Sequence, residues 1–351
     1  MNKKSGEIVK LNQEGRIYLI SSSTIISLAF YGWAVPASLD VQDGTTMLTL
    51  YMATAASGIL IPYFMTNNAR VSIGDAAMTS AGQFVGIMHG AAIPYLFQKD
   101  PDHTAILGSM FLFSVAEGIA GYQISRNYNY YDGKGLLIRN ANFMGAGWGT
   151  MLSGGLDLFE QSKIREFLAL SLISSAAFDV AAANMADNQF LTSGDVDMIT
   201  TPFVLGAMAG ASIGMIADLN NFRTMFYGAS LLSLAGGAYG YYLTEGYDFS
   251  SFDGAITELA TLGGGLIGAG VGYLISSSNI DKPGEQIFRD VITCSSIAGI
   301  GTYAICYNAF KKDSKAEKGF KTSLDYFVNP MAFMNKNPNL SVPLAGVNIK
   351  F

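Results

Sequence analysis

The sequence is short of charge, proline and cysteine, and each shortage narrows the class of protein. Charged residues make up 14% of the chain, against about 25% in soluble proteins. Nine prolines beside 40 glycines exclude collagen and a proline-rich linker. The two cysteines, Cys294 and Cys306, are twelve residues apart in one predicted helix. They are separated by about 18 Å along its axis, which is too far for a disulfide.

The sequence also lacks the motifs that carry catalysis or bind cofactors. It contains no G-x-S-x-G, no P-loop and no His-Glu-x-x-His. G-x-G fragments occur at 263–265 and 268–270, but no predicted strand precedes them, so no dinucleotide site is expected. His89 and His103 have no second His or Cys at ligand spacing. We therefore expect no enzyme, no cofactor and no metal site.

What the sequence does contain is a series of long apolar segments. Half of its residues are apolar, and most of the segments have about the 20 residues that a helix needs to cross a bilayer. They lack the period-2 alternation of outer-membrane β-strands. We predict an all-α polytopic membrane protein of about ten transmembrane helices; a soluble bundle of glycine-packed helices is the alternative. The segments are 17–36, 44–66, 75–97, 104–125, 136–155, 165–186, 199–218, 224–243, 254–277 and 287–309.

The first segment has two interpretations. Lys3, Lys4, Lys10 and Arg16 precede it, and Val35-Pro36-Ala37 resembles a signal-peptide cleavage site. The long basic region favours a retained first helix instead. The net charge of −6, with Lys and Arg gathered at the two ends of the chain, provides no basic face for nucleic acid.

An internal repeat organises the apolar region. Four short loops recur along the chain, and each has an aspartate next to its third position. That third position falls at residues 74, 133, 194 and 252, so the copies are spaced by 59, 61 and 58 residues. A glycine pair follows twelve and sixteen residues later in every copy. The pairs are Gly86 and Gly90, Gly145 and Gly149, Gly206 and Gly210, Gly264 and Gly268.

Each copy contains a first helix, a polar loop ending in the Gly-Asp element, and a second helix with a G-x3-G face. The Asp or Ser of the loop is suited to cap the second helix, and the glycines let neighbouring helices approach closely. In the third copy, Pro202 behind Thr200-Thr201 indicates a later helix start. The sequence predicts tandem glycine-zipper helix pairs with a period of about 60 residues.

Composition divides the chain into three parts. Residues 1–16 form a polar N-terminal segment, 17–309 a repeat-built helical membrane domain, and 310–351 a basic linker with a polar tail. The linker contains Lys311, Lys312, Lys315, Lys318 and Lys321. The tail has short β-like runs at 340–342 and 346–351, which fit a small hairpin.

A few polar residues inside the apolar segments are candidate functional residues, because charge within a membrane is costly. Glu117 and Asp179 lie 16 and 15 residues before the next loop glycine, at nearly the same depth in adjacent copies. They form either a shared cation or proton site or separate hydrogen-bond acceptors. Arg139 either lines a water-filled cavity, pairs with one of these acids, or precedes a helix that begins later. His89 adjoins a G-x3-G face and is a candidate proton relay.

Two classes of function fit these features. The first is a non-enzymatic integral membrane scaffold, or a subunit of a bacterial envelope complex, with residues 310–351 as a site for other envelope proteins. The second is a channel or transporter with an intramembrane acidic site at Glu117 and Asp179. What recurs in the chain is helix-packing chemistry, which favours the first. The location expected is the lipid bilayer, with inner and outer membrane both open.

Overall fold

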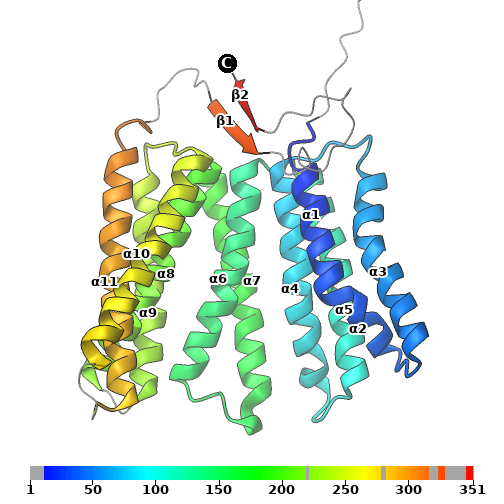
Figure 1. Ribbon diagram of the computed structural model, residues 1–351, viewed down its shortest axis with the longest axis horizontal. Helices are drawn as coiled ribbons and strands as arrows, with labels where there is room; N and C mark the ends of the chain where they lie inside the picture. Colours follow the sequence, from blue (N-terminus) through cyan, green and yellow to red (C-terminus); the bar gives the residue numbers. More distant parts are fainter. Residues whose placement is uncertain (1–11, 219–220, 278–281, 316–322, 329–344, 351) are drawn as a thin grey trace, which may run out of the picture. The chain divides into compact units, whose positions relative to one another are not determined.

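The computed structural model describes residues 12–218, 221–277, 282–315, 323–328 and 345–350 (Figure 1). The N-terminal helix comprises Arg16–Ile26 (α1), a π-helical turn Ser27–Tyr31 and Gly32–Ser38 (α2), which form one continuous span. The remaining helices are Gly44–Met65 (α3), Ile73–Phe97 (α4), His103–Asn127 (α5), Asp132–Gly155 (α6), Ile164–Asn188 (α7), Ser193–Ala217 (α8), Phe222–Thr244 (α9), Ser251–Ser277 (α10) and Gly284–Phe310 (α11). The predicted all-helical domain is therefore confirmed over the described residues.

Six of these helical spans are long and apolar enough to cross a membrane, which indicates a membrane protein. They are the α1–α2 span, α3, α5, α7, α8 and α10. Large apolar side chains remain exposed along them. On α10, Leu259, Leu266, Ile267 and Leu274 are 65–70% exposed, as expected for a face that meets lipid or another apolar surface.

The chain forms two compact units, residues 1–190 and 191–351. In the first unit α1 and α2 pack on α3, α4 on α5, and α6 on α7. In the second, α8 packs on α9 and α10 on α11. The repeat had suggested that each G-x3-G helix pairs with the helix before it. That pairing is wrong by one helix, because each such helix makes its extensive contacts with the helix that follows (Figure 1).

Neighbouring hairpins meet at the starts of their first helices, where glycines allow backbones to touch. A β-carbon on Gly135 of α6 would lie 2.6 Å from the Cα of Gly74 on α4. In the second unit, a β-carbon on Gly254 of α10 would lie 2.8 Å from the Cα of Gly194 on α8. Such distances leave no room for a side chain, so these four glycines are required by close approach of the backbones.

The helix starts carry the polar caps that the repeat suggested. Ser72 and Asp75 form a reciprocal capping box at the start of α4, and Thr192 and Asp195 form the same arrangement at α8. Each box satisfies amides that have no partner inside the helix. At α6 the N-cap is Tyr131, which makes no side-chain cap, so the capping motif is not uniform among the copies.

Pro202 does not mark a helix start, contrary to the sequence-based expectation. Helix α8 begins at Ser193 and continues through Pro202. A proline inside a helix leaves the carbonyl four residues earlier without its donor. Here that carbonyl belongs to Met198, and the hydroxyl of Tyr303 on α11 donates to it at 3.0 Å. Met198 and Tyr303 belong to the buried core of this unit, with Leu205, Phe249 and Tyr307.

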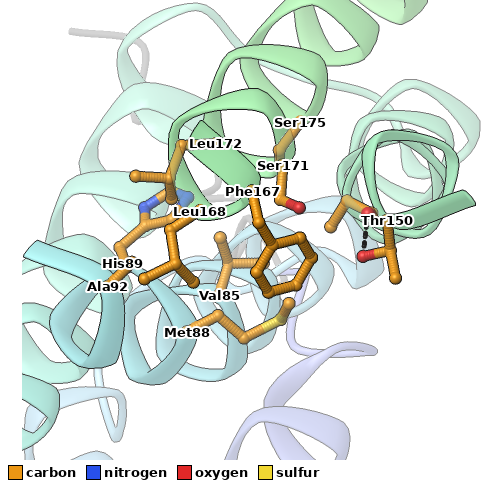
Figure 2. Close-up of a pocket in the computed structure, with 11 residues that line it drawn as sticks. Val85, Met88, His89, Ala92, Thr150, Phe167, Leu168, Ser171, Leu172 and Ser175 are labelled. Atoms are coloured by element: carbon orange, nitrogen blue, oxygen red, sulfur yellow. Dashed lines mark hydrogen bonds between the residues drawn. The ribbon is translucent and has the colours of Figure 1, made fainter. Parts of the chain in front are cut away.

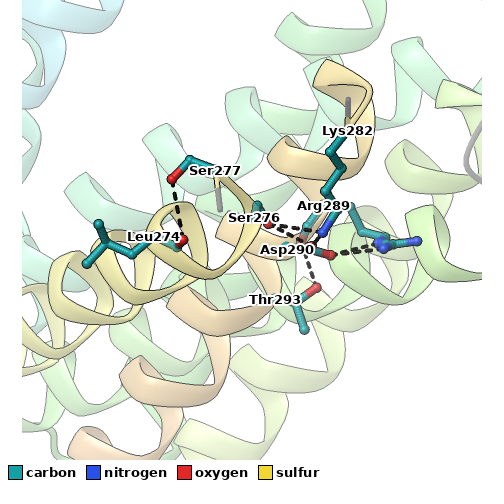
Figure 3. A network of polar contacts seen from close by, with 7 residues as sticks. All are labelled: Leu274, Ser276, Ser277, Lys282, Arg289, Asp290 and Thr293. Carbon is teal, nitrogen blue, oxygen red and sulfur yellow. Dashed lines mark hydrogen bonds and ion pairs between the residues drawn. The ribbon is translucent and has the colours of Figure 1, made fainter. Parts of the chain in front are cut away.

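A charged network closes the far end of the α10–α11 hairpin (Figure 3). Asp290 accepts a hydrogen bond from Ser276 at 2.7 Å and pairs with Arg289 at 3.0 Å. Lys282 also pairs with Asp290. The carboxylate therefore links the end of α10 to the first turns of α11.

The C-terminal tail contributes two antiparallel strands, Ser323–Val328 (β1) and Ala345–Lys350 (β2), with Ser323 opposite Lys350. The predicted β-like run at 340–342 lies outside the described residues, as do Lys318 and Lys321. The same holds for Lys3, Lys4 and Lys10 of the N-terminal segment.

Candidate intramembrane polar site

The first unit contains an ion pair between helices α4 and α5. Nδ1 of His89 lies 2.8 Å from Oε1 of Glu117. The two side chains are 25% and 27% exposed, so the pair is largely enclosed by protein. Both residues were candidates from the sequence, but their contact was not predicted. They are 28 residues apart and lie on different helices, so no spacing within one helix indicates the contact.

A second polar cluster joins helices α6 and α7. Nδ2 of Asn142 donates to Oδ2 of Asp179 at 2.6 Å. The hydroxyl of Ser175 donates to Oδ1 of the same asparagine at 2.6 Å. The other carboxylate oxygen, Oδ1 of Asp179, is buried and has no hydrogen-bond partner in the described part of the chain. An unpaired buried carboxylate oxygen is costly, which singles out Asp179 as a group that needs a further partner.

The two clusters lie on helices that pack together, since α4 contacts both α6 and α7. The arrangement brings together side chains from four helices. The direct partner of Glu117 is His89 and that of Asp179 is Asn142, so the two acids share no hydrogen bond.

Arg139 takes a different position from those proposed for it. Its guanidinium donates to the hydroxyl of Tyr18 on α1 at 2.6 Å and to the side chain of Asn140 at 3.0 Å. It forms no ion pair with Glu117 or Asp179, and α6 begins at Asp132, so Arg139 lies well inside its helix. The hypotheses of an acid partner and of a later helix start are therefore wrong.

A cavity of about 70 Å³ adjoins the site between α4, α6 and α7 (Figure 2). Most of its wall is apolar, including Phe167 and Leu172. His89, Thr150, Ser171 and Ser175 supply the polar part of the lining. The hydroxyl oxygen of Ser171 is buried without a partner among the described residues. The cavity thus connects the histidine with an unsatisfied hydroxyl.

Asn142, Ser171 and Ser175 were not among the candidate residues. Ser171, Ser175 and Asp179 are spaced by four residues, so they share one face of α7. That spacing was the available signal.

The site is confined to the first unit. Sixteen residues before position 252, the place equivalent to Glu117 is occupied by Gly236 in α9. Within the described ranges, no group of three His, Cys, Asp or Glu side chains could hold a metal ion. The geometry fits exchange of protons and hydrogen bonds among titratable groups within a helical membrane protein.

Comparisons with protein-family models, curated proteins and solved structures give no match.

Proposed function

We propose that this chain is a non-enzymatic integral membrane scaffold, or a subunit of a bacterial envelope complex. The observation that carries the proposal is the backbone packing of its hairpins. A β-carbon on Gly86 would lie 2.5 Å from the carbonyl oxygen of Phe113. The same construction gives 2.6 Å for Gly145 against Ser174, 2.1 Å for Gly206 against Leu232 and 2.3 Å for Gly268 against Cys294.

These contacts suit a rigid support. Helices that touch through their backbones cannot slide or separate without losing many contacts at once. The four hairpins that open with a G-x3-G helix share these close approaches, which supports the proposal of a glycine zipper repeated in both units. The exposed apolar side chains of α10 suit a bilayer or partner helices, and the tail beyond the helices is suited to hold envelope proteins.

The proposal is tested by purifying the full chain from native membranes in mild detergent, beside a chain that lacks residues 312–351. Reciprocal capture, in which a tagged copy of the recovered protein retrieves this chain, identifies specific partners. We expect the deletion to release them. The melting temperatures of both forms are compared, because the deletion also removes the backbone bond from Asp248 to Ser314. If both forms purify alone after chemical cross-linking in the membrane, the scaffold proposal is wrong.

A channel or transporter is the second candidate function. It is supported by the meeting of His89, Glu117 and Asp179 inside the first unit, because ionisable groups in membranes mark ion pathways. Flux into liposomes across a pH or ion gradient tests it. Glu117→Gln and Asp179→Asn should abolish flux, whereas Glu258→Gln on α10 should not. Equal flux in the unaltered protein and in all three variants excludes a channel or transporter that uses these acids.

A further inference from the structure

In the first unit His89 bonds the carboxylate of Glu117 directly. It also lines a cavity together with Ser175, whose hydroxyl bonds the asparagine that donates to Asp179. We infer that His89, Glu117 and Asp179 form one proton-binding centre, whose proton is exchanged between His89 and Glu117. The inference deepens the second candidate function, on which it rests, because it names the proton as the ion that the site binds.

The chemistry of the three groups favours a proton. Imidazole is the side chain whose charge changes most readily near neutral pH. A carboxylate that is buried with one unpaired oxygen is stabilised when it gains a proton, because the buried charge is removed. Asp179 has such an oxygen. A metal ion would need more ligands than the described residues of this region provide.

The exchange conserves atoms and charge. When the proton moves from the imidazolium Nδ1 of His89 to Oε1 of Glu117, one N–H bond breaks and one O–H bond forms. The ion pair then becomes a neutral pair joined by the same hydrogen bond. The net charge of the pair is zero in both states, so the transfer requires no counter-ion. The observed 2.8 Å separation is within hydrogen-bonding distance.

The adjoining cavity provides a place for water. Its volume of about 70 Å³ exceeds the roughly 10–15 Å³ that one water molecule needs in the same measure. Nε2 of His89 accepts or donates no hydrogen bond to the described residues. Ser171 offers an unpaired hydroxyl on the same lining. Water between them would continue the path along α7 toward Ser175, whose hydroxyl bonds the asparagine that holds Asp179.

The packed helices carry the charged and titratable groups nearest to this site. Helix α5 contributes Glu117, the ion-pair partner of His89, and α7 contributes Asp179, which is bonded by Asn142 of α6. Helix α6 also carries Arg139, whose guanidinium donates to the hydroxyl of Tyr18 on α1.

The chain contains two histidines, which makes a direct test practicable. Full-length protein carrying isotope-labelled histidine is placed in lipid nanodiscs, and the ring resonances are followed by NMR as the pH changes. His103 is the internal reference, since it is exposed at the start of α5 beside Asp102. His103→Gln leaves His89 as the only histidine and assigns its signal.

We expect Glu117→Gln and Asp179→Asn each to move the His89 titration midpoint by roughly half a pH unit or more, about threefold in proton affinity. Asp102→Asn should move His103 alone, and Glu258→Gln should move neither. If Asp179→Asn reduces folding yield, Asp179→Ser is measured in its place, with melting temperature as the check. A His89 midpoint that is unchanged by either acid variant, or a His89 that does not titrate, overturns the inference.

The proton-binding centre and the transport function can be tested separately. If His89 titrates as expected but liposomes show no flux, the proton centre stands and transport is wrong. If flux is lost in Glu117→Gln while the histidine titration is unaltered, the acid acts in transport without a shared proton and the inference is wrong.

Discussion

The hydroxyl of Tyr303 donates to the carbonyl oxygen of Met198, the one helical acceptor in α8 that Pro202 deprives of its usual donor. The two residues are 105 positions apart in the sequence. Both are buried, at 6% and 0% exposed. A tyrosine on one helix therefore repairs the interruption that a proline makes in another, and α8 continues without a break.

Tyr303→Phe should destabilise the second unit. It leaves the Met198 carbonyl buried and unpaired, which costs about 1–3 kcal/mol. In a Pro202→Ala background the residue at 202 regains its N–H, and that amide can donate to the same carbonyl. The cost of Tyr303→Phe should then fall by at least about half. Thermal unfolding of the unaltered protein, the two single variants and the double variant in one detergent gives the coupling free energy between the two positions.

Tyr307→Phe is the matched control for this cycle. Its hydroxyl also donates to a backbone carbonyl, that of Leu243, at 3.0 Å. The residue four positions after Leu243 is Tyr247 and not a proline, so this bond does not depend on Pro202. Its cost should be unchanged by Pro202→Ala. Equal coupling for both tyrosines would show that Pro202→Ala alters the core generally and would refute the repair.

Two glycines of α10 should respond to alanine in opposite directions. A β-carbon on Gly268 would lie 2.3 Å from the carbonyl oxygen of Cys294, whereas one on Gly270 would meet nothing within 4 Å. Gly268→Ala should cost about 1–3 kcal/mol through overpacking. Gly270→Ala should be neutral or stabilising by up to about 1 kcal/mol, because alanine favours the helix. The stability of each variant is measured by unfolding in the same detergent. Equal changes in stability for the two variants would show that the backbone contact at Gly268 does not cause the loss.

Asp195 should matter more than its counterpart Asp253. Its two carboxylate oxygens accept hydrogen bonds from the backbone amides of Phe249 at 2.9 Å and Thr192 at 2.8 Å, and its side chain is fully buried. Asp195→Ala should cost roughly 2 kcal/mol or more because two amides lose their acceptor. Asp253 caps only its own helix through Ser250, so Asp253→Ala should cost about 1 kcal/mol. Unfolding curves that rank the variants the other way would reject the bridging role.

The sequence predicted the helices well because the apolar segments carry their own signal. The segment at 104–125, for example, corresponds to α5 at His103–Asn127. The helix pairing was missed because a 60-residue period has no marked beginning, so the repeat can be divided before or after the Gly-Asp loop. Gly15 would have helped. It lies 59 residues before Gly74, and its β-carbon position is 1.9 Å from the carbonyl oxygen of Ser72. The contact is similar to that of Gly194, whose β-carbon position is 2.1 Å from the carbonyl oxygen of Ser250.

The candidate site was found in part. Glu117 and Asp179 attract notice because acids are rare in apolar segments. Their partners could not be deduced, because His89 and Asn142 reach them from other helices and no local spacing encodes that contact. Pro202 was misread for the same reason: its compensation by Tyr303 depends on the packing of α8 against α11.

The start of α3 should lose stability in acid through a single exposed group. Asp43 caps this helix, accepting hydrogen bonds from the amide and the hydroxyl of Thr46, both at 2.7 Å. The hydroxyl bond and then the amide bond hold the pKa of Asp43 below its usual value. A lowered pKa in the folded state means that the cap is fully effective above the unfolded pKa of about 3.9. Its contribution is lost as the pH falls through the folded value.

Hydrogen-exchange protection of the first-turn amides of α3 measures this loss. Protection should be constant from neutral pH to about pH 5 and should fall below about pH 4. Asp43→Asn keeps an oxygen acceptor but cannot titrate, so its protection should stay flat across the same range. Asp43→Ala should be low at every pH. Parallel profiles for the native protein and Asp43→Asn would show that another group causes the acid sensitivity, because only the carboxylate changes charge at this cap.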